Sequence, residues 1–231
     1  MFSIIIPLDS NRLEQFKNTK RIYDGMPQRK EFIIPTRSEP ELRKFFDRHN
    51  LWKDVRIIPY IHEVGFNCSK ALNIGVSNAK YPYIIITSPE VKPLTPVLEQ
   101  LEKLLGTNII CKVWNQDQNN NIKGRPLISS RLEKSKNPQM YFLAMFNKED
   151  IEKINGWDEE FMKGYAYEDC DFGARWTRAG IPFVVRDDIT ALNQYHPRVE
   201  TIPGGSRINL KRFEENNKAG IIKCSNGLKK L

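Results

Sequence analysis

The 231-residue sequence has few cysteines and no long hydrophobic run. Its four cysteines lie too far apart for a Cys-x-x-Cys pair or a zinc-finger pattern, so we expect free thiols in a reducing compartment. No stretch approaches the ~20 apolar residues of a membrane span. The apolar run of residues 2–8 stops at Asp9 and is too short for a signal peptide. These absences favour a soluble, cytoplasmic protein.

The net charge is +8, from 36 Lys and Arg against 28 Asp and Glu. Such an excess suits a nucleic acid, an anionic membrane surface or an anionic nucleotide as partner. Part of this excess lies in residues 203–231, which contain seven cations and only two glutamates. A solvated tail or a last helix is the simplest interpretation of this segment. No recognised nucleic-acid motif accompanies the charge, so no nucleic-acid partner is expected. Peripheral membrane contact through this basic segment stays open.

The first 90 residues alternate between short β-branched runs and amphipathic stretches. In the first amphipathic stretch, Leu13, Phe16 and Ile22 are expected to point inward. Continuous β-branched runs are typical of strands buried on both faces of a sheet. The alternation therefore predicts an α/β fold with a mostly parallel central sheet flanked by helices. Such sheets bind ligands beyond the carboxyl ends of their strands. The expected strands are residues 3–7, 31–35, 55–60 and 83–87, and the expected helices are residues 11–23, 40–49 and 69–79.

The second half of the sequence is less regular. No internal repeat or linker divides it, so one domain is the simplest interpretation. A polar stretch containing NQDQNNN predicts a mobile loop over residues 115–138. The other expected elements are helices at residues 94–105 and 148–154, and strands at residues 108–114, 140–146 and 182–186.

Residues 156–180 form an acidic, aromatic segment, GWDEEFMKGYAYEDCDFGARWTRAG. Six carboxylates and three cations give it a local charge of −3 in a basic protein, and its aromatic residues suit a lined pocket better than a solvated face. Residues 168–179 predict a helix that stops at Gly180, with an i, i+4 ion pair between Asp171 and Arg175. The acidic first turn could also simply cap a surface helix, because the helix dipole favours carboxylates there.

Three stretches carry a resemblance to a known family. They are SIIIPLDSNR, then GFNCSKALNIGVSNAKYPYIIITSPE, and finally GWDEEF with GYAYEDCDF followed by an Arg and a Gly. Together they resemble inverting glycosyltransferases with the GT-A fold, and are similar to the family 2 enzymes and to the galactosyltransferase and chondroitin-polymerase group. The resemblance covers about residues 2–197. It implies a single-domain, Rossmann-like GT-A architecture with a nucleotide-sugar half over about 1–92 and an acceptor half over about 93–200. A basic extension, 201–231, would be packed on the domain or trail from it.

The resemblance implies that the acidic segment acts on an acceptor hydroxyl of a glycan or glycoconjugate. Asp169 matches the general base of the family's Glu-Asp pair. Glu168 would then bind and orient the acceptor. Trp157 and Tyr167 are candidates for stacking on a sugar face, although Trp157 could equally pack in the core beneath the loop.

The metal motif that the family usually carries is altered in this sequence. Asp-x-Asp normally follows the fourth strand, and here the position reads Thr-Ser-Pro-Glu, with Ser88 replacing the first carboxylate. Glu90 occupies the position of the second carboxylate. His196 matches the late His that completes the metal site in many relatives, although a lone His is often structural. We expect manganese or magnesium to bind Glu90 and His196 together with diphosphate and water oxygens, more weakly than in an Asp-x-Asp enzyme.

The donor site is more diffuse. Backbone groups and a carboxylate at the end of the first strand could meet base and ribose, and two nearby cations could meet phosphate. The family often has an acid after the second strand, whereas this sequence has Arg37, so UDP is only the default nucleotide. Arg125 and its Asn-rich loop could line or close the acceptor site. The candidate donor-binding residues are Pro7, Leu8, Asp9, Arg12, Lys70 and Ser88.

Other functions stay open beside the leading prediction of an inverting, metal-assisted hexosyltransferase of polysaccharide biosynthesis. A catalytically inactive sugar-nucleotide-binding module would explain the altered metal motif, although the intact Glu168–Asp169 pair argues against it. A nucleotidyltransferase normally needs a Gly-rich phosphate loop after the first strand, and IIIPLDSNR has no glycine.

Overall fold

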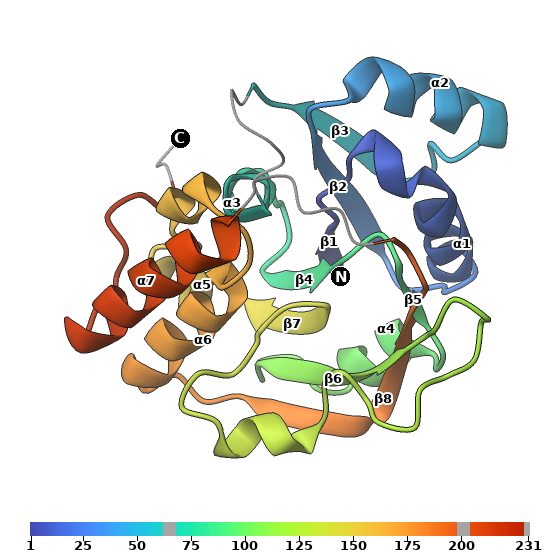
Figure 1. Ribbon diagram of the computed structural model, residues 1–231. Coiled ribbons are helices and arrows are strands. Elements are labelled where there is room, and N and C mark those ends of the chain that lie inside the picture. Colours follow the sequence, from blue (N-terminus) through green and yellow to red (C-terminus); the bar gives the residue numbers. More distant parts are fainter. Residues whose placement is uncertain (62–67, 198–203, 229–231) are drawn as a thin grey trace.

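The computed structural model describes residues 1–61, 68–197 and 204–228. Within these ranges it has one eight-stranded sheet of order β3-β2-β1-β4-β7-β6-β8-β5, with helices on both faces (Figure 1). The strands are β1 (Phe2–Ile5), β2 (Lys30–Thr36), β3 (Val55–Pro59), β4 (Tyr83–Thr87), β5 (Val91–Pro93), β6 (Ile109–Asn115), β7 (Leu143–Asn147) and β8 (Val184–Asn193). The helices are α1 (Leu13–Asp24), α2 (Glu39–His49), α3 (Cys68–Ser77), α4 (Val97–Glu102), α5 (Lys148–Lys153), α6 (Glu168–Arg178) and α7 (Gly205–Lys218), with 3-10 turns η1 (Ser10–Arg12), η2 (Ser130–Lys134) and η3 (Glu159–Lys163).

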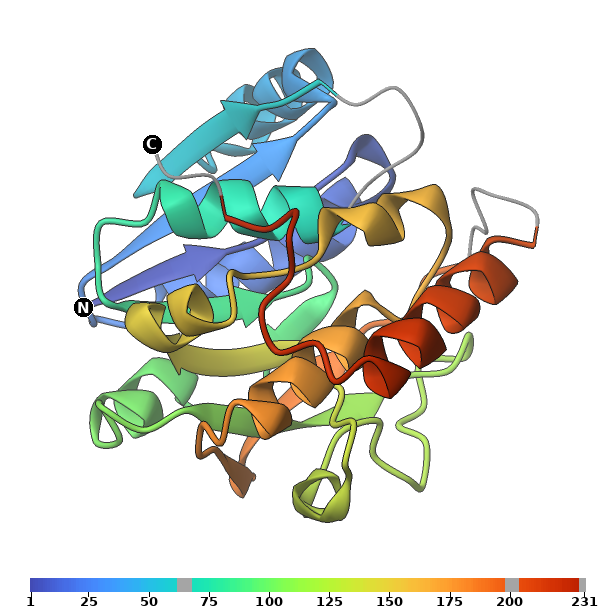
Figure 2. The same ribbon diagram turned by 90° about the vertical axis from the view of Figure 1, so that its left-hand side faces the viewer.

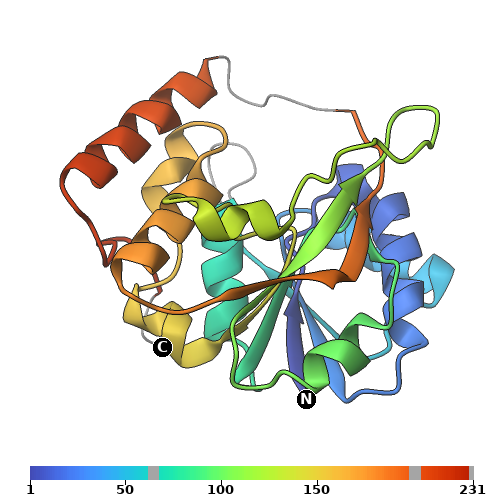
Figure 3. The same cartoon turned by 90° about the horizontal axis from the view of Figure 1, so that it is seen from below.

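The N-terminal half forms the predicted parallel sheet. β1 pairs in parallel with β2 and β4, and β2 pairs in parallel with β3. Right-handed crossovers put α1 and α2 on one face, and the change of direction between β3 and β4 puts α3 on the other, as Figure 1 and Figure 3 show. The four strands end at one common edge, and the strand order reverses between β1 and β4. This carboxyl edge is where such a sheet favours a ligand.

The C-terminal half of the sheet turns antiparallel and curls. β7 runs antiparallel to β4 and β6, β8 runs parallel to β6, and β5 runs antiparallel to β8. In β8, Arg186 pairs with Cys111 but Thr190 pairs with the next residue, Lys112, so residues 187–189 bulge out and the strand bends. The bend brings the last residues of β8 to β5, which follows β4 closely in the chain. The residues after β8 therefore return to the carboxyl edge.

The expected α/β class is confirmed, and the core lies on both faces of the sheet. Side chains of the central strands such as Ile4, Ile33 and Ile85 are fully buried. In α1, Phe16 and Tyr23 are buried, but Ile22 is 38% exposed, so the expectation that Ile22 points inward is wrong. Phe16 and Tyr23 are seven residues apart and share one helix face, whereas Ile22 is rotated away from it.

Other differences concern element lengths. The helix expected over residues 94–105 shrinks to α4, because Pro93 ends β5 and Pro96 precedes the first helical turn. The strand expected from residue 140 begins only after Phe142, whose φ of 58° is incompatible with a strand. Part of the polar stretch after β6 is ordered, with bridges from Val113 to Ile128 and from Gln116 to Ile122 besides η2.

The basic C-terminal segment packs on the domain. α7 lies along α6 on the outer side of the molecule (Figure 2). Arg212 forms an ion pair with buried Asp158 at 2.7 Å, and Asn217 accepts a hydrogen bond from Arg178 at 2.6 Å. Among the described residues, no helix is both long enough and apolar enough to cross a bilayer.

Candidate active site

The acidic pair Glu168–Asp169 begins α6 and lies in a densely packed part of the molecule. Both side chains are half-buried. Burial raises the pKa of Glu168 to about 7, and the neighbouring Asp169 carboxylate adds to the rise. Burial also raises the pKa of Asp169, which accepts a hydrogen bond from the Cys170 N–H at 2.8 Å. Carboxylates with raised pKa values bind protons more readily than exposed ones, and Glu168 can hold or accept a proton near neutral pH.

The body of α6 is fixed by a buried ion pair. Arg175 Nε donates to Asp171 Oδ2 at 2.7 Å, with both side chains almost fully buried, and this confirms the predicted structural role of Asp171. Arg175 also donates to the carbonyl of Ile154, and Asn216 of α7 donates to the second Asp171 oxygen. The pair is thus embedded in further hydrogen bonds, as a buried charge requires. The buried ion pair therefore fixes the first turns of α6, from which Glu168 and Asp169 extend.

The loop before α6 has an unusual backbone. Ala166 and Tyr167 both adopt the left-handed conformation, with φ of 61° and 69°. Two consecutive non-glycine residues in this region are strained and persist only when the surroundings fix them. Tyr167 is half-buried and stacks near Phe213, with ring centroids 5.8 Å apart. It remains accessible to a sugar, so its predicted acceptor role stays a proposal.

Trp157 does not line the site. Its side chain is fully buried and stacks on Phe172 with ring centroids 4.0 Å apart. Asn73 of α3 fixes its backbone by donating to the Trp157 carbonyl at 2.8 Å and accepting from its N–H at 2.9 Å. Stacking of this ring on an acceptor sugar is incompatible with the structure, because no ring face is free. Trp157 instead packs beneath the loop.

Glu90 and His196 come together although 106 residues separate them in the sequence (196 − 90). The β5–β8 register pairs Val91 with Asn193, so the residues just beyond both strands are neighbours. Gln194 braces the turn by donating from its backbone and its side chain to the Glu90 carbonyl, each at 3.0 Å. His196 Nε2 then lies 3.5 Å from Glu90 Oε1.

Arg12, the last residue of η1, contacts the residues that follow β8. Its guanidinium lies 2.8 Å from His196 Nδ1 and donates to the Pro197 carbonyl at 3.2 Å. Because arginine can only donate, Nδ1 must be the acceptor, and a neutral ring then carries its proton on Nε2, towards Glu90. A chain of donors thus runs from Arg12 through His196 to Glu90.

The oxygen and imidazole donors of this turn suit manganese or magnesium, but they are few. Within the described ranges, no group of three or more His, Cys, Asp and Glu side chains gathers as a metal site. Magnesium commonly uses one or two carboxylates and takes its remaining ligands from substrate phosphates and water. Glu90 and His196 fit that pattern once Arg12 leaves Nδ1, because a ring nitrogen cannot accept from arginine and also carry the proton that metal ligation at Nε2 requires.

Asp9, Arg37 and Ser38 form a polar cluster at the carboxyl ends of β1 and β2. Asp9 accepts hydrogen bonds from Arg37 at 2.7 Å, from the Ser10 N–H at 3.0 Å and from the Ser38 hydroxyl. Burial opposes ionisation of Asp9, but these hydrogen bonds, led by that of Ser38, hold its pKa below the ordinary value. At the place after β2 where the resemblance leads one to look for an acid, Arg37 thus forms an ion pair that joins the two strand ends.

The remaining donor candidates differ in accessibility. Pro7 and Leu8 are buried, so only their backbone could meet a ligand. Lys70 in the first turn of α3 donates to the Ile61 carbonyl at 3.1 Å. Ser88 is 2% exposed and hydrogen-bonds with Tyr141, so its hydroxyl faces protein.

Cys68 and Tyr141 lie between the two sets of carboxylates and were missed at the level of sequence. The β4–β7 register pairs Thr87 with Leu143, which brings Tyr141 beside the residues that follow β4. Burial raises the pKa of Cys68, and Glu168, Asp169 and Glu90 all add to the rise. The thiol is therefore within electrostatic range of both sides of the site. Only the strand register, which single-sequence patterns do not give, could have identified this pair.

The comparisons with known proteins concern the whole chain and one part of it. A family model described as the N-terminal domain of galactosyltransferase matches residues 140–198. Crystal structures of S. aureus TarS 1-349 match with a TM-score of 0.70 and 11% identity, over 97% of this chain and 66% of that one. The same protein in complex with UDP-GlcNAc matches with a TM-score of 0.66 and 10% identity, over 87% of this chain and 60% of that one.

A third match is the mannosyltransferase PcManGT from Pyrobaculum calidifontis in complex with GDP-Man and Mn2+. Its TM-score is 0.63 at 14% identity, over 94% of this chain and 63% of that one. The chain has the GT-A glycosyltransferase fold. It spans about two thirds or less of the length of these structures. A search of curated proteins gives no match.

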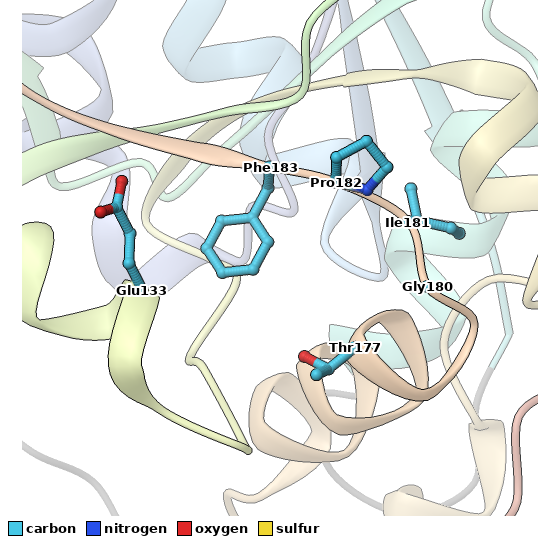
Figure 4. A pocket seen from close by; sticks show the side chains of 6 residues that line it. All are labelled: Glu133, Thr177, Gly180, Ile181, Pro182 and Phe183. Atoms are coloured by element: carbon cyan, nitrogen blue, oxygen red, sulfur yellow. The ribbon is translucent and has the colours of Figure 1, made fainter.

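A hollow of about 420 Å³ lies away from the GT-A carboxyl edge. It is lined by η2, the C-terminal end of α6 and the chain leading to β8 (Figure 4). Its Glu133 accepts a hydrogen bond from the Val185 N–H at 2.9 Å, and Thr177 donates to the Gly173 carbonyl. These polar groups serve the fold, and the acidic pair is at the opposite end of α6. We therefore take the carboxyl edge, and not this hollow, as the candidate site. The residues lining the hollow are Glu133, Thr177, Gly180, Ile181, Pro182 and Phe183.

Proposed function

We propose that the chain is an inverting glycosyltransferase that moves a sugar from a nucleotide-sugar to a hydroxyl of a glycan or glycoconjugate. The observation that carries the proposal is the half-buried Glu168–Asp169 pair at the start of α6, which, like Glu90, is close enough to Cys68 to raise the pKa of its thiol. The matched structures include one in complex with UDP-GlcNAc and one in complex with GDP-Man, which supports a nucleotide-sugar as donor.

The proposed chemistry is a single displacement. Asp169 accepts the proton of the acceptor hydroxyl, whose oxygen forms a bond to the anomeric carbon of the donor sugar. The bond from that carbon to the diphosphate oxygen breaks, and the diphosphate leaves with the electron pair. Glu168 holds a neighbouring acceptor hydroxyl, and burial raises the pKa of Asp169, which makes it a stronger proton acceptor than an exposed aspartate. Attack from the face opposite the leaving group inverts the anomeric configuration.

The leaving diphosphate needs positive charge. We propose that Glu90 and His196 hold manganese or magnesium, which when bound would stabilise the diphosphate as a Lewis acid. Arg12 would release His196 and turn its guanidinium to a phosphate oxygen. The N-terminal half, about residues 1–92, would hold the nucleotide, with UDP as the default, and residues 93–200 would hold the acceptor.

The setting of the reaction is also part of the proposal. The four cysteines are free thiols, which supports a reducing, cytoplasmic compartment. α7 packs on the acceptor half. Exposed cations of the C-terminal segment, such as Lys211 and Lys223, are the candidate contact with an anionic membrane.

A second candidate is a sugar-nucleotide-binding module without activity. It is favoured by the altered metal motif, in which Glu90 is the single carboxylate. Ser88, at the place of the other carboxylate, is buried against Tyr141. One experiment separates the two candidates. A panel of UDP-, GDP- and CDP-sugars is incubated with the protein, with and without manganese, and released nucleoside diphosphate is measured. Manganese-dependent release supports the enzyme, and saturable binding without release over hours supports the module.

A further inference from the structure

We propose that Asn209 of α7 is a positioning residue for the Glu168–Asp169 pair, an inference that rests on the proposed function. Asn209 is 1% exposed. Its amide donates one hydrogen bond to the Phe161 carbonyl at 2.9 Å and another to the Ala166 carbonyl at 2.7 Å. Both amide protons are thus used. They hold the two ends of the loop 161–166, which stops two residues before Glu168.

The second bond acts where the backbone is strained. Ala166 and Tyr167 are the two consecutive left-handed residues, and the peptide after Tyr167 starts α6. Strained turns persist when neighbouring groups over-determine them. By holding the Ala166 carbonyl, Asn209 fixes the turn that sets the direction in which Glu168 and Asp169 leave the loop.

The fit between α7 and the loop is close. A Cβ on Gly164 would lie 2.4 Å from the Gly205 carbonyl oxygen and would also collide with the Asn209 side chain. Phe213, one turn further along α7, stacks near the Tyr167 ring. The loop therefore cannot shift towards α7, and the two hydrogen bonds prevent it from shifting away. α7, which lies outside the resemblance to the family, thus becomes the outer support of the acidic pair.

A second buried asparagine holds the chain just before this loop. Asn73 of α3 makes two hydrogen bonds with the backbone of Trp157. The chain that leads to the acidic pair is therefore held by two buried asparagines, Asn73 at residue 157 and Asn209 at residues 161 and 166. Asn73 lies on the parallel half and also supports the core near Trp157. Among the described residues, both hydrogen bonds of the Asn209 amide go to the loop, so its substitution acts on the loop directly.

Loss of the Asn209 bonds should change the pair in two ways. The carboxylates move relative to the acceptor, and a displacement of about 1 Å can lower turnover by about 10²-fold. The loosened loop also admits water, which relieves the burial that raises both pKa values. The titratable groups that interact with the pair are Cys68 and Cys170, and Tyr141 and Glu90 interact with Cys68 in turn; none of them lies on α7.

Asn209→Asp and Asn209→Ala test the proposal, with Asn217→Ala as the control. The Asp variant keeps the shape but places carboxylate oxygens against two carbonyls. Asn217 is also on α7 but contacts Arg178 at the far end of α6. We expect both Asn209 variants to lower kcat about 10²-fold with the donor KM unchanged, and Asn209→Ala to move the acid limb of the kcat–pH profile to lower pH. Asn217→Ala should lower Tm comparably and leave kcat and the profile unchanged.

A readout without turnover keeps the proposal independent of the proposed function. Carbon-detected NMR of the Glu168 carboxyl should give a midpoint near the raised value in the wild type, and a lower one in Asn209→Ala only. Equal midpoints in the two proteins, or kcat losses in all variants in proportion to Tm, would overturn the positioning role. Absence of glycosyl transfer by the wild type, with the midpoint shift intact, would instead overturn the proposed function alone.

Discussion

The two sides of the candidate site are built differently. The helix side, Glu168 and Asp169, starts a helix that is anchored by a buried ion pair and supported by two buried asparagines. The turn side, Glu90, His196 and Arg12, consists of residues just beyond strands or in a short 3-10 turn. The Glu90 and His196 side chains there are 13% and 19% exposed. The helix side is thus fixed without a ligand, whereas the turn side would have to rearrange around the proposed phosphate and cation. In the proposed reaction, preorganisation is therefore concentrated on the side that accepts the proton.

The largest effect is expected on the helix side. Asp169→Asn should lower kcat about 10³-fold, because the amide cannot accept the proton, and should leave donor affinity unchanged. Glu168→Gln should lower kcat less and raise the acceptor KM. Steady-state kinetics with thermal unfolding as the folding control checks both. A greater kcat loss in Glu168→Gln would transfer the role of base to Glu168.

On the turn side, a tenfold effect on binding is expected. Glu90→Gln should weaken manganese-dependent binding of a nucleoside diphosphate about tenfold, because a hard anionic ligand is lost. Isothermal titration with and without manganese measures it. Glu99→Gln, at an exposed i, i+4 pair with Lys103, is the matched control. Equal affinities of wild type and Glu90→Gln in manganese would remove Glu90 from the metal site.

Substitutions of Trp157 and Tyr167, on either side of the loop 161–166, should separate an effect on stability from an effect on acceptor binding. Trp157→Phe should lower the free energy of unfolding by about 1–3 kcal/mol and leave the acceptor KM within about twofold. Tyr167→Leu should raise the acceptor KM about fivefold, or about 1 kcal/mol, since it loses a stacking surface. Denaturant titration and acceptor saturation curves check the pair. An acceptor KM that responds to Trp157→Phe more than to Tyr167→Leu would contradict the assignment.

A further effect is a pH dependence of stability. The pKa of Glu168 rises from 4.5 to about 7 on folding. Between these values the unfolded chain releases this proton and the folded protein keeps it, so stability should fall as pH rises from 4.5 to 7 and level off above. Tm measured against pH should therefore decline less steeply in Glu168→Gln than in the wild type. Parallel curves would mean that Glu168 is ionised at ordinary pH in the folded protein.

The sequence predicts the helix side better than the turn side for a physical reason. The start of α6 is encoded locally, in its acidic first turn, its apolar face and the Gly180 stop, and the i, i+4 partnership of Asp171 and Arg175 needs only helical spacing. The parallel strands of the first half are likewise continuous β-branched runs. These features depend on neighbours in the chain.

What the sequence could not predict depends on distant contacts. The resemblance groups Glu90 with His196, but the β8 bulge and the three-residue β5 that bring the two together leave no periodic signal. The donor chain from Arg12 to His196 joins residues far apart in the sequence. Trp157 and Tyr167 are both aromatic and lie ten positions apart, yet one is fully buried and the other is partly exposed beside Phe213, because packing on α3 and α7 decides their exposure.

The most direct test of the account is the anomeric configuration of the first product. Base-assisted attack by the acceptor in one displacement inverts the anomeric centre, so an α-linked nucleotide-sugar should give a β-linked product. Proton NMR of the reaction mixture, read from the coupling constant of the new anomeric proton before any mutarotation, distinguishes the outcomes. An inverted product is predicted. A retained configuration would contradict the role of the α6 carboxylates as general base.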